Sequence, residues 1–333
     1  MTDLASLLAE KGVLLADGGM GTGLFELGLT TGDNPEIWNV DHPDRVAAVH
    51  RSFVGAGSDI ILTNSFGGTR YRLKLHGHQD RVGELNRTAA KLCREVADTA
   101  GRPVVVAGSI GPTGELLVPL GSMTKDDAVA AFAEQAAALA EGGVDVLWIE
   151  TMSAPEEVEA AVEGASTTGL PVVTTMSFDT NGRTMMGLTP EAAVAFFRTL
   201  PRVPTAYGAN CGVGPAQLLA TLVDFAGAKT PAEVVVAKGN CGIPEYRDGH
   251  ICYSGTVELM SAYARLARDA GAGIVGGCCG TTAKHLAAMR HALDSSERGP
   301  VPDIAQVERE LGPVAVVAAP APDSSRERRR RRA

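Results

Sequence analysis

The stretch DVLWIETMSAPEEVEAAVEGASTTGLPVVTTM, residues 145–176, shows the unit from which the fold is predicted. It opens with a short apolar run, continues with an amphipathic segment from Pro155 to Thr168 and, after Gly169, ends in a second apolar run. Short apolar runs rich in β-branched residues predict buried strands, and the longer amphipathic segment predicts a helix. Pro155 and the two glutamates after it suit the first turn of that helix, and Gly169 suits the cap at its end. The stretch therefore predicts a strand, a helix and a second strand.

The same alternation recurs along the whole chain. The predicted strands are 13–16, 59–63, 104–107, 145–149, 171–176, 205–209, 234–237 and 273–275. The helical segments that follow them are 43–56, 84–99, 125–141, 155–168, 190–199, 215–225, 257–270 and 283–293. Eight strand-then-helix units in about 290 residues are typical of a (β/α)8 TIM barrel, so this α/β fold is predicted as a single domain. A doubly wound sheet is the alternative, but the glycines of 18–23 lack the G-x-G-x-x-G spacing of its nucleotide loop.

Composition limits the class of protein. The 333 residues are 45% hydrophobic and 21% charged, as in soluble globular enzymes. No apolar run reaches the ~18 residues that cross a bilayer, and the N-terminus lacks the pattern of a signal peptide. A cytoplasmic protein without a membrane partner is therefore expected. Six cysteines are too few for a disulfide scaffold, which favours metal binding or catalysis by the thiols.

Positive charge is concentrated at the C-terminal end. Residues 324–333 hold six of the 30 basic residues and one of the 39 acidic ones, which leaves 24 basic and 38 acidic residues in the remainder. An acidic body of this kind argues against nucleic acid as a partner. The barrel is expected over residues 1–295. Residues 296–333 are expected to be a partly disordered C-terminal extension whose Arg-rich end is solvated, a partner-binding arm being the alternative.

Three cysteines with glycine neighbours follow predicted strands. Cys211 lies in GANCG (208–212), and Cys278 and Cys279 lie in GGCCG (276–280). Because the C-terminal ends of barrel strands meet at one rim, where active sites of this fold lie, the three sulfurs are expected to converge. Three protein ligands with a fourth position left for substrate are typical of a catalytic zinc site. The alternative is that these cysteines are small buried apolar residues.

The remaining cysteines are placed outside this site. Cys93 falls in a predicted helix and is expected to pack in the core, whereas Cys241 lies near the rim and Cys252 has no comparable context. Adjacent cysteines such as 278 and 279 rarely reach the geometry of a disulfide with each other.

Polar side chains are predicted at the same rim. Asp17 and Glu150 each follow a strand and are either ion-pair partners at the barrel end or carboxylates that hold a substrate ammonium group. Asn210 and Asn240 are also substrate-binding candidates, although asparagine often only completes a turn. The side-chain oxygen of Asn240 could alternatively fill the open zinc position when substrate is absent.

Aromatic residues are few, at 5% of the chain. Trp38, in a predicted loop, and Phe66 and Tyr71 are candidates to line an aromatic cage around a quaternary ammonium methyl donor. Packing in the core is the alternative for each of them.

These motifs resemble the homocysteine S-methyltransferase family. The resemblance rests on DGGMGT (17–22), TNSFGG (63–68), Glu150-Thr151, GANC (208–211) and GGCCG (276–280), and it runs from about residue 10 to 295. It implies a barrel that binds Zn²⁺ through Cys211, Cys278 and Cys279, with the homocysteine sulfur as the fourth ligand. It also implies that Asp17 and Glu150 contact the homocysteine amino group, with the backbone of Gly18 and Gly19 nearby.

Within that family, GDNPEIWN (32–39) and SFGG (65–68) resemble the short bacterial betaine–homocysteine methyltransferases. Glycine betaine is therefore the favoured donor. S-methylmethionine, dimethylsulfoniopropionate and the methyl group of a separate corrinoid protein are the alternatives. Vertebrate betaine enzymes carry a Tyr near the position of Gly67, and Tyr71, one turn further on, is the candidate substitute.

The reaction expected is attack of a zinc-bound homocysteine thiolate on the donor methyl group, giving methionine, because zinc deprotonates the thiol. A zinc hydrolase and a redox or metal sensor are the rival functions. The H-x-E and P-C-x-x-C signature of zinc deaminases is absent from the sequence. A homo-oligomer is left open.

Overall fold

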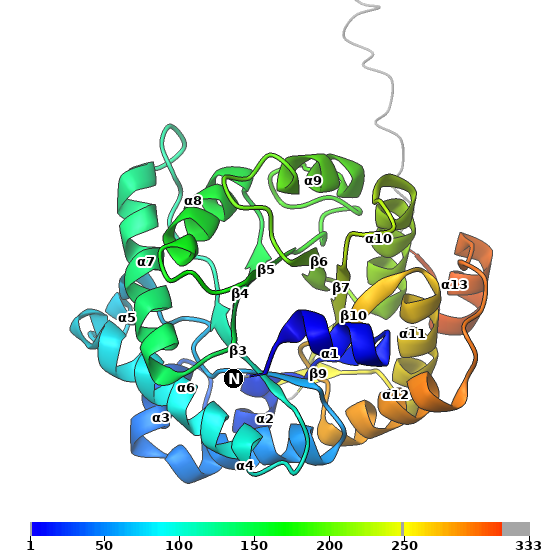
Figure 1. Cartoon of the computed structure of the whole chain (residues 1–333), viewed down its shortest axis with the longest axis horizontal. Coiled ribbons are helices and arrows are strands. Elements are labelled where there is room, and N and C mark those ends of the chain that lie inside the picture. The colour runs from blue at the N-terminus through cyan, green and yellow to red at the C-terminus, as the bar shows by residue number, and fades with distance from the viewer. Residues whose placement is uncertain (1, 248–249, 315–333) are drawn as a thin grey trace, which may run out of the picture.

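The structure is a computed structural model that describes residues 2–247 and 250–314. Within these residues, eight parallel strands form one sheet that curves into a barrel surrounded by helices (Figure 1). The strands are β1 Leu14–Leu15, β2 Ile60–Leu62, β3 Val105–Ile110, β4 Val146–Met152, β5 Val172–Met176, β6 Ala206–Cys211, β7 Val235–Gly239 and β10 Ala272–Gly277. Their order around the barrel is β1-β10-β7-β6-β5-β4-β3-β2. The predicted single-domain (β/α)8 barrel is confirmed.

The outer layer consists of the helices that follow the strands. They are α4 Pro43–Gly55, α6 Val82–Asp98, α7 Lys125–Gly142, α8 Pro155–Ser166, α9 Pro190–Phe197, α10 Pro215–Ala228, α11 Val257–Asp269 and α12 Ala283–Ser295. Helix α8 begins at Pro155, as predicted, because proline has the φ of a first helical turn and lacks an N–H that would be left unbonded there. None of the described helices is long and apolar enough to cross a membrane.

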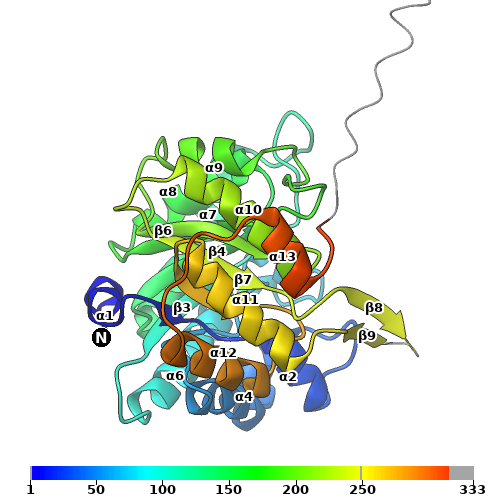
Figure 2. The ribbon, with the colours of Figure 1, turned by 90° about the vertical axis from the view of Figure 1, so that its right-hand side faces the viewer.

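Shorter elements complete the described chain. They are α1 Leu4–Lys11, α2 Met20–Glu26, η1 Pro35–Ile37, α3 Trp38–Asp41, α5 Arg70–Lys74, η2 Gln79–Arg81, β8 Pro244–Arg247, β9 His250–Tyr253 and α13 Ile304–Leu311. Strands β8 and β9 pair as an antiparallel hairpin that projects from the barrel (Figure 2).

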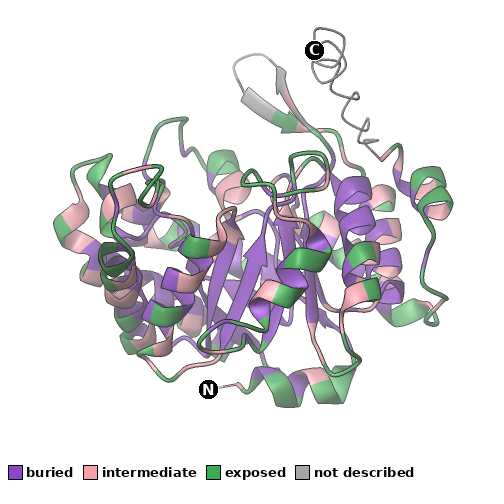
Figure 3. Cartoon of the chain, turned by 90° about the horizontal axis from the view of Figure 1, so that it is seen from above, coloured by how far each residue is buried: buried purple, intermediate pink, exposed green. Residues whose placement is uncertain are grey.

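Strand residues alternate between the barrel interior and the layer under the helices. In β4, Val146 and Trp148 belong to the interior cluster, whereas Leu147 and Ile149 belong to the outer one. This is the period of two that a strand imposes on its side chains. Both faces of the sheet are therefore buried, and exposure is confined largely to the helices and loops around it (Figure 3). Helix α1 lies across the barrel opening in Figure 1 and adds its leucines to the interior cluster.

The junction between β1 and β2 is closed partly by side chains. One bridge pairs Ala16 with Ile60. Around it, a carboxylate oxygen of Asp59 accepts a hydrogen bond from the N–H of Leu15 at 2.9 Å, and a carboxylate oxygen of Asp17 accepts one from the N–H of Leu62 at 2.7 Å. Two amides at this seam are thus bonded by buried aspartates, where a regular ladder would use carbonyl groups.

A helix follows the expected boundary at residue 295. Helix α13 lies beyond it and buries Val307 and Leu311 in the outer core cluster, on the side of the barrel where α10 and α11 lie (Figure 2). Part of the predicted extension therefore packs on the barrel, after a polar, proline-containing linker. The Arg-rich end lies outside the described residues.

Candidate metal and substrate site

The three glycine-flanked cysteines converge. Cys211 is the last residue of β6, and Cys278 and Cys279 follow β10, so all three lie at the C-terminal rim of the barrel. Their sulfur atoms lie within 4.8 Å of one another, and none of the three forms a disulfide. Cys211 has a φ of 63°, in the left-handed region that a non-glycine residue rarely adopts. Local strain of this kind is typical of functional sites.

The donor set fits a zinc ion. Four ligands about 2.3 Å from zinc in a tetrahedron place neighbouring sulfurs about 3.8 Å apart, which agrees with the cluster. In the described part of the chain, no histidine or carboxylate joins the three sulfurs as a fourth ligand. Three soft ligands and one open position are the arrangement of catalytic rather than structural zinc sites.

The sulfurs already share charge among themselves. Hydrogen bonds from Cys211 and Cys278 lower the pKa of Cys279 to about 3. The same bonds raise the pKa of Cys211, because that thiol would lose its proton beside another thiolate. The three sulfurs are therefore close enough to share hydrogen bonds, in which one thiol stabilises negative charge on another.

Asparagine side chains hold the loops that carry the cysteines. The Nδ2 of Asn240 donates to the carbonyl of Gly212 at 2.6 Å, and its Oδ1 accepts from the N–H of Cys279 at 3.1 Å. Asn240 thus joins the loop after β6 to the loop after β10. Its oxygen, predicted as a candidate zinc ligand, is engaged by a main-chain amide in this structure.

Asn210 is fully engaged as well. Its Oδ1 accepts from the N–H of Thr151 at 2.8 Å and from the hydroxyl of Thr175 at 2.7 Å. Its Nδ2 donates to the Thr151 hydroxyl at 2.7 Å and lies 4.0 Å from the sulfur of Cys278. Asn210, a substrate-binding candidate, ties three strand ends together beside the cysteine cluster.

Gly18 and Gly19 pack directly against the cysteine loop. The N–H of Gly19 donates to the carbonyl of Thr281 at 3.0 Å. A Cβ at Gly19 would lie 2.9 Å from the carbonyl oxygen of Cys278, and one at Gly18 would overlap the carbonyl of Thr281. The glycines are required because the first loop of the barrel approaches the cysteine loop backbone to backbone.

A layer of inward-facing polar side chains lies next to the sulfurs. Its members continue the interior positions of their strands, two residues beyond the apolar layer, and they are Ser109, Glu150, Thr175, Asn210 and Lys238. Asp17 joins this layer from the end of β1 through an ion pair with Lys238. Both candidate carboxylates therefore lie close enough to Cys278 to interact with it electrostatically.

Glu150 and Asp17 differ in how they are bound. The Oε1 of Glu150 accepts from the hydroxyl of Ser109 at 2.5 Å, and burial raises the pKa of Glu150 to about 7. Asp17 is 1% exposed, and its Oδ1 accepts from the ammonium of Lys238 at 2.7 Å. For Asp17 the structure shows the ion-pair alternative that the sequence left open.

The aromatic candidates separate into core and rim. Trp38 was expected in a loop, but Asn34 caps η1, which leads directly into α3, so Trp38 is helical. Its ring is 6% exposed and packs edge-on against His42, with Arg45 over its face. This is the core-packing alternative.

Phe66 and Tyr71 lie nearer the rim. Phe66 is 37% exposed in the loop after β2, where its ring covers Gly111. Tyr71 lies on α5 and packs against the edge of the outer core cluster. Phe66 is therefore the most exposed of the three aromatic candidates.

Three residues near the cysteines received no role from sequence reasoning, and only Thr151 among them stood in a quoted motif. Lys238 was overlooked although a lysine at an interior position of an apolar strand is unusual, which is a signal the strand period offers. Thr151 has a φ of 61° and binds Asn210. Tyr253 reaches back from the hairpin, and its phenol interacts with Cys279 while its ring covers Gly280. A hairpin contact of this kind has no local sequence signature.

The excluded cysteines lie outside the cluster, as predicted. Cys93 is fully buried in α6 and Cys252 is exposed. Cys241 is buried, and its sulfur lies 3.5 Å from Nε2 of His285.

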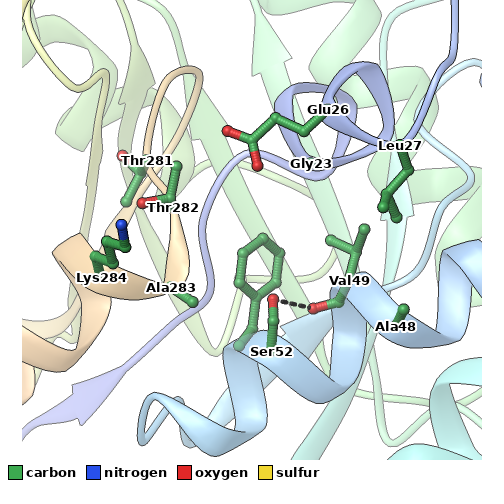
Figure 4. A pocket seen from close by; sticks show the side chains of 11 residues that line it. Gly23, Glu26, Leu27, Ala48, Val49, Ser52, Thr281, Thr282, Ala283 and Lys284 are labelled. Carbon is green, nitrogen blue, oxygen red and sulfur yellow. Dashed lines mark hydrogen bonds between the residues drawn. The ribbon is translucent and has the colours of Figure 1, made fainter.

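A separate pocket of about 350 Å³ lies between α2, α4 and the start of α12 (Figure 4). Glu26 faces Lys284 and Thr282 across it, and Val49 and Leu27 line its apolar side. None of the three cysteines lines this pocket, so it is distinct from the cysteine cluster.

Comparison with known proteins agrees with this geometry. Residues 14–293 match the family model described as homocysteine S-methyltransferase. The chain is 31% identical over 314 residues to methionine synthase of Mycobacterium tuberculosis (strain ATCC 25618 / H37Rv), which covers 89% of this chain and 26% of the relative. Methionine synthase of Mycobacterium leprae (strain TN) is 31% identical over 318 residues, with 90% and 26% covered. The chain thus spans about a quarter of the length of the curated relatives it matches.

Solved structures share the fold. The metallated form of the homocysteine methyltransferase MmuM from Escherichia coli superposes with a TM-score of 0.72 at 24% identity, covering 86% of this chain and 98% of that one. Its oxidized form gives a TM-score of 0.71 at 25% identity, with the same coverage.

Proposed function

The chain belongs to the homocysteine S-methyltransferase family, and we propose that it moves a methyl group from a small donor to the sulfur of homocysteine, forming methionine. The observation that carries the proposal is the convergence of three reduced sulfurs within 4.8 Å at the active-site rim of the barrel. A site that leaves one position of a zinc ion open to a substrate thiol suits chemistry on sulfur.

The cofactor proposed is Zn²⁺ held by Cys211, Cys278 and Cys279. Bound there, it would supply a Lewis acid that lowers the pKa of the substrate thiol, which is otherwise only a few per cent ionised at pH 7. The chain positions the ligands through Asn210 and Asn240, whose amides hold the strand ends and loops on which the cysteines lie. A reducing compartment, the cytoplasm, is proposed as the location because three close thiols must stay reduced.

Methyl transfer needs alignment and the exclusion of water. The homocysteine sulfur attacks the methyl carbon, a sulfur–carbon bond forms as the bond from that carbon to the donor nitrogen breaks, and the leaving amine keeps the electron pair. The thiol proton leaves to solvent before this step. Buried polar partners around Glu150 and the apolar layer under them keep the acceptor end of the site dry, which favours a step in which charge is neutralised.

Glycine betaine is the donor we propose to test first, on the sequence resemblance in residues 32–39 and 65–68. Phe66, with its exposed ring at the rim, supports a cationic methyl donor, because aromatic faces attract quaternary ammonium groups. The 31% identity with methionine synthases makes a corrinoid-bound methyl group the second candidate.

The test is methionine formation by zinc-loaded protein with homocysteine, in separate reactions with glycine betaine, S-methylmethionine, dimethylsulfoniopropionate and methylcobalamin. Turnover with one donor establishes both the reaction and the donor class. The proposal would be overturned if homocysteine failed to bind in all four reactions. It would also be overturned if the protein hydrolysed the donors without forming methionine. Binding of zinc and homocysteine without turnover would retain the acceptor half and exclude these four donors.

A further inference from the structure

A tyrosine on the projecting hairpin reaches back to the cysteine cluster. Tyr253 is the last residue of β9, in the hairpin that extends from the barrel (Figure 2). Its phenol hydroxyl lies within hydrogen-bond reach of the sulfur of Cys279, and it is close enough to Cys211 and Cys278 to interact with their charge. A side chain from an element outside the barrel therefore belongs to the surroundings of all three sulfurs.

The turn after the cysteines makes room for this side chain. Gly280 follows Cys279 directly and has a φ of 77°, which favours glycine. A Cβ at Gly280 would lie 2.3 Å from Cγ of Tyr253, so any side chain there would displace the ring. The N–H of Gly280 donates to the hydroxyl of Thr22 at 2.9 Å, which fixes the turn under the ring. The contact between the ring and the turn is therefore built into the packing of the site.

The base of the hairpin is tied to the cysteine loop as well. The N–H of Cys241 donates to the carbonyl of Cys279 at 2.8 Å, and the N–H of Gly255 donates to the carbonyl of Cys241 at 2.9 Å. A Cβ at Gly255 would lie 2.6 Å from the sulfur of Cys241, so the two segments lie in direct contact. These contacts place the chain that follows Tyr253 against the cysteine loop.

The sulfur of Cys279 competes with the substrate sulfur in the proposed reaction. Three sulfurs from the chain and one from homocysteine would surround the proposed zinc ion, and each deprotonated sulfur is a nucleophile. Attack by Cys279 on the donor methyl carbon would form a sulfur–carbon bond there, release the donor's leaving group with its electron pair and leave a thioether in place of a thiolate. A hydrogen bond to the sulfur of Cys279 stabilises its negative charge and so makes it less nucleophilic.

We propose that Tyr253 is a positioning residue of the proposed zinc site, whose hydroxyl makes the sulfur of Cys279 a poorer nucleophile and so directs the methyl group to the substrate sulfur. The hairpin of β8 and β9 is the element that delivers the hydroxyl. The assignment rests on the proposed zinc site and the proposed methyl transfer. It includes no contact between Tyr253 and homocysteine.

The test compares Tyr253→Phe, which removes only the hydroxyl, with Tyr253→Ala, which also removes the ring. Tyr207→Phe is the matched control, because Tyr207 lies on β6 but belongs to the outer core cluster. Zinc-loaded full-length protein is treated briefly with iodoacetamide, which alkylates sulfur by the same kind of displacement, with iodide as the leaving group. Mass spectrometry gives the ratio of labelling at Cys279 to labelling at Cys278, and Cys252, exposed on the same hairpin, is the internal reference.

The labelling ratio should rise about 10-fold in both Tyr253 variants, as for the loss of one hydrogen bond to a charged group, and should stay at the wild-type value in Tyr207→Phe. A second readout uses protein loaded with Co²⁺ in place of zinc. Its sulfur-to-cobalt charge-transfer absorption should move to longer wavelength in both Tyr253 variants, because the sulfur electrons are held less tightly without the hydroxyl. Neither measurement requires turnover.

An unchanged labelling ratio or an unshifted cobalt band in Tyr253→Phe would overturn the assignment. A rise of the ratio in Tyr253→Ala alone would also overturn it, because the ring would then act only as a cover. If the wild-type protein holds zinc but forms no methionine from homocysteine, the proposed function fails, and the labelling ratio and the cobalt band still decide the role of Tyr253. A wild-type protein that binds neither metal would overturn both proposals.

Discussion

The side-chain oxygen of Asn240 accepts a hydrogen bond of 3.1 Å from the main-chain N–H of Cys279. The same amide donates to the carbonyl of Gly212, next to Cys211, so one asparagine joins the two loops that carry the proposed zinc ligands. Partners that orient metal ligands in this way typically contribute a factor of 10 to 100 to metal affinity.

Replacing Asn240 with Ala should therefore weaken zinc binding by roughly 10- to 100-fold, measured by competition with a chelator. Gln306→Ala, on α13, is the matched control and should leave the affinity unchanged. An unchanged affinity in Asn240→Ala would mean that the cysteine loops hold their positions without the amide.

Removal of a sulfur tests the metal site itself. Cys278→Ala should lose both zinc retention and methionine formation, because two thiols do not replace the three-ligand set. Cys252→Ala removes an exposed thiol outside the cluster and should retain both. Zinc content by elemental analysis and activity are measured on the same samples, and full activity in zinc-free Cys278→Ala would contradict the proposed chemistry.

Stability of the metal-free protein should depend on pH through Glu150. Burial raises its pKa from 4.5 to about 7, so between these values the folded state binds the proton more tightly than the unfolded state does. Its contribution to stability is full below pH 4.5 and is lost as the pH rises through 7. Glu150→Gln has no such loss. The free energy of unfolding of the variant, minus that of wild type, should therefore rise by about 3 kcal/mol from pH 4.5 to pH 8. Urea unfolding of both proteins at the two pH values measures this rise. If the difference in free energy of unfolding between variant and wild type is the same at both, the pKa of Glu150 is not raised.

The seam of the barrel depends on Asp59. This buried carboxylate accepts from Lys11 at 2.6 Å, from Arg290 at 3.2 Å and from the N–H of Leu15. Asp59→Ala should lower the free energy of unfolding by about 3 to 5 kcal/mol, because it leaves buried donors without their acceptor. Asp98→Ala breaks an exposed ion pair with Arg94 and should cost less than about 1 kcal/mol in the same urea titration. If Asp59→Ala and Asp98→Ala lower the free energy of unfolding by similar amounts, the carboxylate of Asp59 is not needed at the seam.

Helix α13 should contribute to the stability of the barrel. Leu311 is 8% exposed in the outer core cluster, whereas Ile304 on the same helix is 41% exposed. Leu311→Ala should lower the free energy of unfolding by about 2 to 3 kcal/mol, and Ile304→Ala by clearly less. If the two variants lose the same stability in thermal and urea unfolding, the packing of α13 does not stabilise the barrel, and the folded unit ends near residue 295.

The barrel was predictable because its signals are local. Each predicted strand overlaps an observed one, since both faces of a parallel sheet are buried and the strands appear as short apolar runs. Convergence of Cys211 with the pair 278–279 followed from the fold alone, because strand ends of a barrel share a rim.

The errors arose where tertiary contacts decide the outcome. Trp38 is helical and buried because a capped 3-10 turn directs it into α3, and a proline next to polar residues suggested a loop. The hydrogen bonds that backbone amides give to Asn210 and Asn240 could not be predicted either, because their partners are far away in the sequence. Their predicted roles toward substrate stay predictions. Lys238 was missed because the strand patterns were searched for apolar residues. A charged residue at an interior strand position was not considered.

The carboxylates at the β1–β2 seam have a consequence for how the fold is maintained. A barrel is ordinarily closed by main-chain groups, which every residue supplies, so closure is indifferent to mutation. Here the amides of Leu15 and Leu62 are bonded by Asp59 and Asp17, so part of the closure is encoded in two side chains. Deuterium uptake at those two amides should consequently change when the aspartates are replaced, whereas uptake elsewhere in the sheet follows the main chain alone. Asp17 bonds the β1–β2 seam and also lies in the polar layer beside the cysteines. Separation of β1 from β2 and ligand binding at the rim are therefore expected to affect each other through this one residue.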